Sequence, residues 1–200
     1  MHTIDLSFSG PFGWSLNGPL PTILSKGIGD QPGIYLWTAG TDDGELVWYV
    51  GETARSFRQR MREHLVEQLG GRYRILDPVG FEKGRKSYLW HGGYGESKGN
   101  WPDRFLTELP TLAKPLAEFV RVMRFMIAPL DSDTRVRRRI EAALADYLYA
   151  QPDPVGSFQE EIYYERTRPD EEPLQVTIAS ATPIRGLPAT LLVDGNTAQG

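Results

Sequence analysis

The segment 56–70 places a cation and an imidazole where a helix should be apolar. Ser56-Phe57-Arg58-Gln59 has the form of a capping box, and Gly70-Gly71 ends the helical pattern. Five residues with i, i+3, i+4, i+7, i+8 spacing share one side of this helix: Phe57, Arg60, Met61, His64 and Leu65. Partly buried polar groups need a partner or a chemical task, so Arg60 and His64 are candidates for a functional site.

A second predicted helix, from after Asp131-Ser132-Asp133 to about Tyr149, repeats the anomaly with a carboxylate. The face that should pack inward contains Arg137, Ile140, Glu141, Leu144 and Leu148. Glu141 is therefore a further candidate. The alternative is an ordinary salt bridge with Arg137 one helical turn away, in which case Glu141 would tolerate alanine.

Two tyrosines lie on a predicted β-hairpin that precedes the first helix. The runs 33–37 and 46–50 are β-branched and aromatic, and the stretch 38–45 between them is rich in Asp and Gly. Tyr35 and Tyr49 fall on the two strands. Taken alone, such tyrosines are usually half-buried packing residues.

The remaining elements are predicted from periodicity and from Gly and Pro. Residues 1–30 indicate an N-terminal extension made of an edge strand and loops, and residues 31–150 a central domain with a stranded insertion at about 72–100. Residues 101–112 favour a helix, residues 119–127 a third strand, and residues 151–200 a hairpin with an acidic tail.

Composition excludes several kinds of site. The chain has no cysteine, which excludes disulfides, thiolate zinc sites, iron–sulfur clusters and a cysteine nucleophile. Without a leader pattern or a stretch near ~20 apolar residues, we expect a soluble cytoplasmic protein with no membrane partner. The net charge of -4 argues against a general nucleic-acid coat, but residues 53–104 contain 11 basic and 6 acidic residues and permit a local basic patch.

Four motifs in this order resemble the GIY-YIG nucleases. They are Gly33-Ile34-Tyr35, Tyr49-Val50-Gly51, Arg60 followed by His64, and Glu141 within 140–144. The resemblance covers roughly residues 30–150. It implies an α+β fold with a small, mostly antiparallel, three-stranded central sheet flanked by helices, here with a stranded insertion and extra terminal segments.

The chain departs from the family pattern in three loops and at one polar position. The loop between the tyrosines is long, Tyr49 and Arg60 are separated by about one extra residue, and the segment from His64 to Glu141 is extended. Where the family often has Asn after the glutamate helix, this chain offers Gln159.

The resemblance implies a metal-dependent endonuclease that hydrolyses phosphodiester bonds, in DNA rather than RNA, and leaves a 5′-phosphate and a 3′-hydroxyl. Glu141 would bind Mg²⁺ or Mn²⁺, and Arg60 would neutralise charge on the phosphate. Tyr35 would be the general base and Tyr49 would position the water, while His64 would orient a neighbour or relay the proton.

Further contacts to nucleic acid are expected from basic and aromatic residues outside the motifs: Arg58, Arg85, Lys86, Trp90 and Arg137. Trp90, His91 and Tyr94 have the composition of a base-stacking surface, although such an insertion more often packs on its host domain.

Two other functions stay open. One is a catalytically silent module on the same fold that binds nucleic acid or protein, and the other is an interaction protein with no affinity for nucleic acid. Because small nucleases often need a second copy or a partner protein to cut both strands, a homodimer and a complex with a partner protein are both left open.

Overall fold

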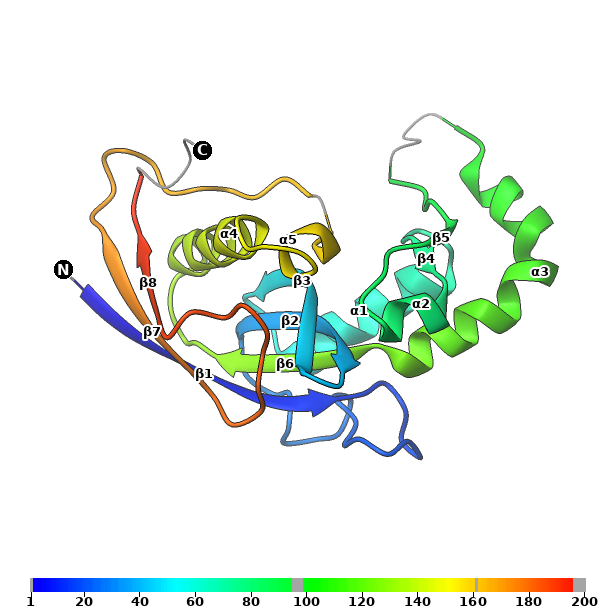
Figure 1. Cartoon of the computed structure of the whole chain (residues 1–200), viewed down its shortest axis with the longest axis horizontal. Helices are drawn as coiled ribbons and strands as arrows, with labels where there is room; N and C mark the ends of the chain where they lie inside the picture. The colour runs from blue at the N-terminus through cyan, green and yellow to red at the C-terminus, as the bar shows by residue number, and fades with distance from the viewer. Residues whose placement is uncertain (1, 95–98, 161, 196–200) are drawn as a thin grey trace.

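A computed structural model describes residues 2–94, 99–160 and 162–195, and its largest element is a six-stranded mixed sheet (Figure 1). The strand order is β3-β2-β6-β1-β7-β8. These strands are β1 (His2–Phe12), β2 (Gly33–Thr41), β3 (Gly44–Thr53), β6 (Arg124–Pro129), β7 (Leu174–Ser180) and β8 (Thr190–Val193). A separate two-stranded sheet pairs β4 (Ile75–Leu76) with β5 (Tyr88–Trp90).

The described residues form five helices beside these sheets. They are α1 (Phe57–Leu69), α2 (Pro78–Glu82), α3 (Trp101–Val122), α4 (Thr134–Tyr149) and α5 (Val155–Phe158). Figure 1 shows α4 and α5 together over β2 and β3, with α2 and α3 grouped at the opposite end of the molecule from β7 and β8.

The prediction of a small three-stranded central sheet is wrong, because the sheet has six strands, although the fold is of the α+β class. The N-terminal strand β1 is not an edge strand, because it pairs antiparallel with β6 and parallel with β7. The expected C-terminal hairpin forms as β7 and β8 and extends the same sheet. The alternating apolar residues of β1 predict a strand with one buried face, but that local pattern does not say how many neighbours the strand has.

The hairpin of β2 and β3 forms as predicted, and two of its positions have no room for a side chain larger than that of glycine. Tyr35 pairs with Gly51, and a Cβ on Gly51 would lie 2.2 Å from Cζ of the Tyr35 ring. Gly33 has φ +152°, and a Cβ there would lie 2.2 Å from the Ala128 carbonyl oxygen. Only glycine fits either position while the strands and the Tyr35 ring stay in place.

Both helices that carry candidate site residues form with the expected side-chain caps. Ser56 Oγ accepts from the Gln59 N–H at the start of α1, and the Asp133 side chain accepts from the Val136 N–H at the start of α4. The buried face of α1 consists of Phe57, Met61, His64 and Gln68, and the Phe57 and His64 rings pack edge-on to Tyr35 of β2.

The insertion and the helix after it differ from expectation. The stranded insertion contains β4 and β5 but also α2, and α3 runs from Trp101 to Val122 with two prolines inside it. Phe119 is therefore helical, and the strand predicted from residue 119 begins only at Arg124. The helix α3 stays packed beyond its prolines because one apolar face is buried along its length, formed by Phe105, Leu112, Leu116 and Phe119. The helix is visibly curved (Figure 1), as expected where proline interrupts the backbone hydrogen bonds.

The outer edge of β3 is covered by the chain that follows α4. The Gln159 side chain and the Glu160 N–H donate to the carbonyls of Val47 and Trp48, at 2.6 Å each, and the Tyr164 hydroxyl donates to the Val50 carbonyl at 3.2 Å. Because an exposed strand edge would pair with other chains, these contacts close the sheet on this side.

The interior position of β1 gives a stability prediction. Leu6 is 1% exposed on β1, whereas its neighbour Asp5 is exposed. Leu6→Ala is expected to lower the free energy of unfolding by about 2–5 kcal/mol because it empties a packed volume. Urea unfolding measures this, and Asp5→Ala on the same strand is the control with little change. Equal, small effects of the two substitutions would contradict a central packed role for β1.

Candidate active site

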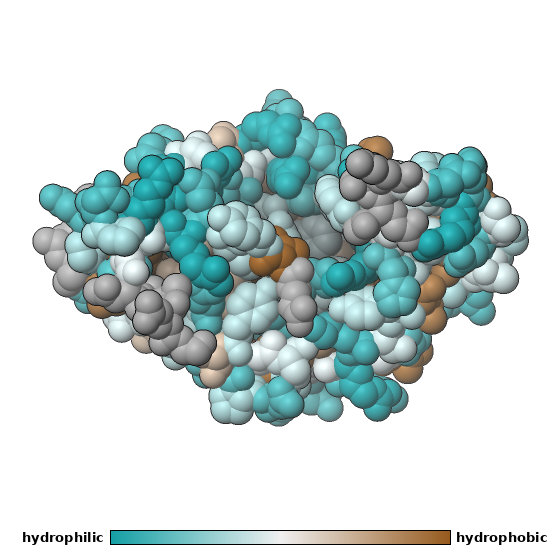
Figure 2. Space-filling view, turned by 90° about the horizontal axis from the view of Figure 1, so that it is seen from above, coloured by the Kyte–Doolittle hydropathy of each residue, from teal (hydrophilic) through white to brown (hydrophobic). Residues whose placement is uncertain are grey.

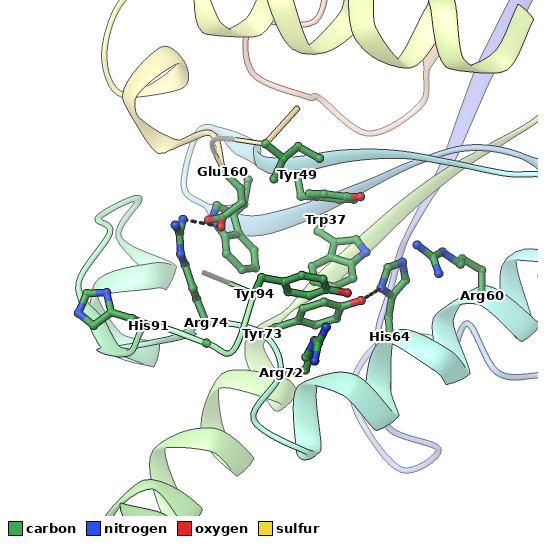
Figure 3. Close-up of a pocket in the computed structure, with 13 residues that line it drawn as sticks. Trp37, Tyr49, Arg60, His64, Arg72, Tyr73, Arg74, His91, Tyr94 and Glu160 are labelled. Atoms are coloured by element: carbon green, nitrogen blue, oxygen red, sulfur yellow. Dashed lines mark hydrogen bonds and ion pairs between the residues drawn. The ribbon is translucent and has the colours of Figure 1, made fainter. Parts of the chain in front are cut away.

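A buried chain of three side chains links β2, α1 and the insertion. The Tyr35 hydroxyl lies 2.8 Å from His64 Nε2, and His64 Nδ1 lies 2.8 Å from the Tyr73 hydroxyl (Figure 3). Burial, followed by the charges of Arg60 and Arg55, holds the pKa of His64 well below its usual range. The neutral imidazole therefore donates through one ring nitrogen and accepts through the other, which makes a path for a proton between the two tyrosines.

Arg60 stands beside the two tyrosines of the hairpin. Burial raises the pKa of Tyr35 to about 12, and the Arg60 guanidinium is close enough to oppose that rise. The rings of Tyr35 and Tyr49 lie 6.1 Å apart, and burial raises the pKa of Tyr49 as well. The Arg60 side chain is partly exposed and pairs loosely with Glu63 at 3.4 Å, so its donors can reach a bound anion.

Glu141 reaches this group from α4 on the other side of β3. Its Oε1 accepts from the Glu52 N–H at 2.9 Å. Burial and then the negative charge of Glu52 raise the pKa of Glu141 to about 8, against the opposing charges of Arg138 and Arg60. Arg137 pairs with Glu52 at 3.1 Å, so the alternative of a simple Arg137–Glu141 helix salt bridge is wrong.

The five predicted site residues thus gather from three consecutive elements and from α4, which follows much later in the chain. Tyr35 comes from β2, Tyr49 from β3, Arg60 and His64 from α1, and Glu141 from α4. The charge of Glu141 raises the pKa of both hairpin tyrosines, which places its carboxylate within electrostatic reach of them.

The five additional residues expected to contact nucleic acid lie in different environments. Trp90 is 2% exposed and donates through Nε1 to the Gly71 carbonyl, and Arg137 is buried in its pair with Glu52, so both expectations are wrong. Arg58 pairs with Asp30 at 2.7 Å and Lys86 Nζ donates to the Gln159 carbonyl at 2.7 Å. Arg85 is exposed and does not line the cavity described below.

Gln159 does not join the site. Its side chain is buried and donates to the Val47 carbonyl, so its observed role is to hold the edge of β3. The next residue, Glu160, lines the cavity instead.

A cavity of about 600 Å³ opens beside the predicted residues and includes Tyr49, Arg60 and His64 in its wall. Two residues named in the sequence as parts of a base-stacking surface, His91 and Tyr94, line this cavity. Sequence reasoning did not assign four of its other residues to a site: Arg72, Tyr73, Arg74 and Glu160. No spacing signal connects the insertion to Glu160, because the contact is made across the fold (Figure 3).

The donor set around Glu141 fits a metal ion held by a single protein carboxylate. The described residues contain no group of three or more His, Asp or Glu side chains placed to share a metal ion. The Glu52 N–H holds one oxygen of the Glu141 carboxylate. Burial and the neighbouring Glu52 carboxylate disfavour the negative charge of Glu141, as its raised pKa shows. A hard divalent cation suits such an oxygen ligand, and water and substrate oxygens complete the shell of Mg²⁺ in sites of this kind.

The surface gives little support to a large apolar docking face. On the face seen in Figure 2 hydrophilic residues predominate and hydrophobic ones are scattered. Among the described parts of the chain, no helix has the length and apolarity needed to cross a membrane.

Comparison with known protein families, curated proteins and solved structures finds no match to this chain. The resemblance to the GIY-YIG nucleases therefore depends on the motifs and on where the structure places their residues.

The contact between Tyr35 and Gly51 gives the next prediction. Gly51→Ala is expected to displace the Tyr35 ring, lengthen its hydrogen bond to His64 and cost about 1–3 kcal/mol of stability through overpacking. The ¹⁵N shifts of the His64 ring report the hydrogen bond directly. Gly13→Ala, where the nearest atom lies at 3.7 Å, is the control, and unchanged His64 shifts in Gly51→Ala would contradict the packing argument.

The raised pKa of Glu141 predicts a pH dependence of stability in metal-free protein. Between the ordinary value of 4.5 and about 8, the folded state holds a proton that the unfolded state has lost. Stability contributed at Glu141 therefore falls as pH rises through this window, by at most about 1.4 kcal/mol per pH unit. Urea unfolding in EDTA should show the fall in the wild type relative to Glu141→Gln. A difference between the two proteins that is constant with pH would show that Glu141 titrates normally.

Proposed function

We propose that the chain is a GIY-YIG type endonuclease that uses a divalent metal ion to hydrolyse phosphodiester bonds in DNA. The observation that carries the proposal is the convergence of Tyr35, Tyr49, Arg60, His64 and Glu141 on one site beside an open cavity. A structural role alone gives no reason for a guanidinium, a neutral imidazole and a buried carboxylate of raised pKa to converge on the two hairpin tyrosines.

Arg60 is the residue placed to hold the scissile phosphate. Its guanidinium presents a planar set of N–H donors that matches two phosphate oxygens and stays charged at every working pH. The nearby groups Tyr35, Tyr49 and His64 are neutral at pH 7, so no resident anion among them competes with the phosphate. As negative charge builds on the phosphorus oxygens, the interaction with Arg60 strengthens and the transition state gains more than the ground state.

The proton of the attacking water leaves through Tyr35 and His64. Tyr35 is a weak base by itself because burial favours its protonated form. It becomes a base when its own proton passes to His64 Nε2 while its oxygen accepts the proton of water, and Tyr73 stabilises the imidazolium through Nδ1. Tyr49 lies beside Tyr35 and orients the water. Attack at phosphorus breaks the bond to the 3′ oxygen, which takes a proton from solvent water and becomes the 3′-hydroxyl, while the 5′-phosphate remains on the other fragment. The proton gained by His64 returns to solvent, which restores the neutral imidazole and the Tyr35 hydroxyl.

Glu141 would hold the metal ion, either Mg²⁺ or Mn²⁺, whose chemistry is to polarise the phosphate and stabilise the departing 3′ oxygen. The Glu52 N–H fixes the orientation of the carboxylate, and Arg137 neutralises the neighbouring Glu52 carboxylate. These contacts keep Glu141 facing the hairpin tyrosines.

The test is cleavage of duplex, branched and single-stranded DNA and RNA with Mg²⁺ or Mn²⁺. Arg60→Ala and Glu141→Ala are each expected to lower the cleavage rate by about 10²-fold or more, because each removes a contact to charge that develops in the transition state. Arg62→Ala on the exposed side of α1 and Glu67→Gln are charge-matched controls that should cut at the wild-type rate.

Three outcomes separate the functions. Metal-dependent cutting lost in Arg60→Ala and Glu141→Ala but kept in the controls supports the nuclease. Salt-sensitive binding without cutting on any substrate favours the silent binding module, and absence of both binding and cutting favours an interaction protein. Dependence of duplex cutting on protein concentration would test the expected homodimer.

A further inference from the structure

The cavity beside the catalytic residues is lined by more than the proposed hydrolysis requires. Tyr49, Arg60 and His64 belong both to its wall and to the proposed active site, so a ligand in the cavity lies next to a phosphate held by Arg60. The rest of the wall comes largely from the insertion and from the chain after α5. Its volume of about 600 Å³ is within the range of small-ligand pockets.

One side of the cavity is an aromatic stack with an open face. The rings of Tyr73 and Tyr94 stack at 5.6 Å with an interplanar angle of 11°, and the Arg72 guanidinium lies 4.6 Å from the centre of the Tyr94 ring. Figure 3 shows the two tyrosine rings parallel to each other, with Tyr49 across the cavity in this view. Tyr94 is 61% exposed, so its ring is accessible to a ligand in the cavity.

The opposite side of the cavity is polar and basic. Arg74 Nη1 pairs with Glu160 Oε1 at 2.6 Å, and the Trp48 side chain lies close enough to hydrogen-bond to the same carboxylate. Arg72 and Arg74 both line the cavity, which places two cations beside the aromatic rings. Aromatic rings beside cations are the composition with which proteins hold single-stranded nucleic acid.

We propose that this cavity receives one nucleobase of the substrate strand, turned out of the helical stack and adjacent to the phosphate at Arg60. The exposed Tyr94 ring, stacked on Tyr73, takes the face of the base. Arg72 and Arg74 add positive charge for the flanking backbone. Every base offers a π face, so stacking of this kind accepts any of the four bases.

This inference rests on the proposed function and specifies its substrate class. A base can enter the cavity only from a single strand, a branch point or a locally opened duplex, because a base inside a regular duplex is stacked and paired. The preferred substrates are therefore single-stranded or branched nucleic acids, and a continuous duplex is cut more slowly.

The experiment measures binding without cleavage. Fluorescence anisotropy in EDTA at fixed salt follows a labelled single-stranded DNA, and a series of matched strands has an abasic site at each position in turn. The proteins are wild type, Tyr94→Ala, Tyr94→Phe, and Tyr163→Ala as a control tyrosine that is 89% exposed and lies outside the cavity wall.

An abasic site at one position is expected to weaken binding by the wild type. Tyr94→Ala should bind the intact strand roughly 5- to 150-fold more weakly, yet bind that abasic strand as the wild type does, because the stacked pair is already broken. Tyr94→Phe and Tyr163→Ala should behave like the wild type.

The inference is overturned if Tyr94→Ala binds the intact strand like the wild type, if no abasic position matters, or if the wild type binds no single strand. The proposed function is judged separately by metal-dependent cleavage and its loss in Arg60→Ala and Glu141→Ala. A nuclease that cuts normally but shows no abasic-sensitive position would retain the proposed function and lose the base pocket.

Discussion

The outer edge of β3 needs hydrogen-bond partners, and the groups that supply them build much of the candidate site. The Glu52 N–H donates to the Glu141 carboxylate, and this contact holds α4 against the hairpin at the point where the helix faces the tyrosines. Further along the same edge, the Trp48 carbonyl accepts a hydrogen bond from the Glu160 N–H, and this contact places the Glu160 side chain in the wall of the cavity. One requirement of the sheet therefore positions both carboxylates.

The inner side of the hairpin follows a second constraint, which is the volume of the Tyr35 ring. Gly51 leaves room for that ring, and Phe57 and His64 of α1 enclose it, so its hydroxyl has a fixed partner at His64 Nε2. A smaller residue at 35 would leave a cavity beneath α1, whereas a larger one at 51 would displace the Tyr35 ring toward α1. The same packing holds Arg60, one helical turn before His64, next to Tyr49.

The parts of the fold and site that sequence predicted are those encoded by local patterns. The cap and apolar spacing of α1, the hairpin runs and the face of α4 are short-range signals, and they bring Arg60, His64, Tyr35 and Glu141 to the correct elements. The place of β1 between β6 and β7 depends on pairings of distant strands, and α3 continues past Pro115 because Phe119 packs on Trp48 and Phe81. The contacts of Tyr73 with His64 and of Arg74 with Glu160 have no periodicity that a sequence could show.

Burial gives the site an electrostatic state that suits an anionic substrate. Tyr35, Tyr49 and His64 are neutral near pH 7, and Glu141, with a pKa of about 8, is largely protonated there in metal-free protein. A phosphate bound at Arg60, as proposed, would meet neutral groups on this side and would replace the loose pair of Arg60 with Glu63 at 3.4 Å. A cation bound at Glu141, as proposed, would have to displace the carboxyl proton, so loss of the proton and gain of positive charge would be coupled. The cost of burying the Glu141 carboxylate in the metal-free protein is therefore one that a bound cation would remove.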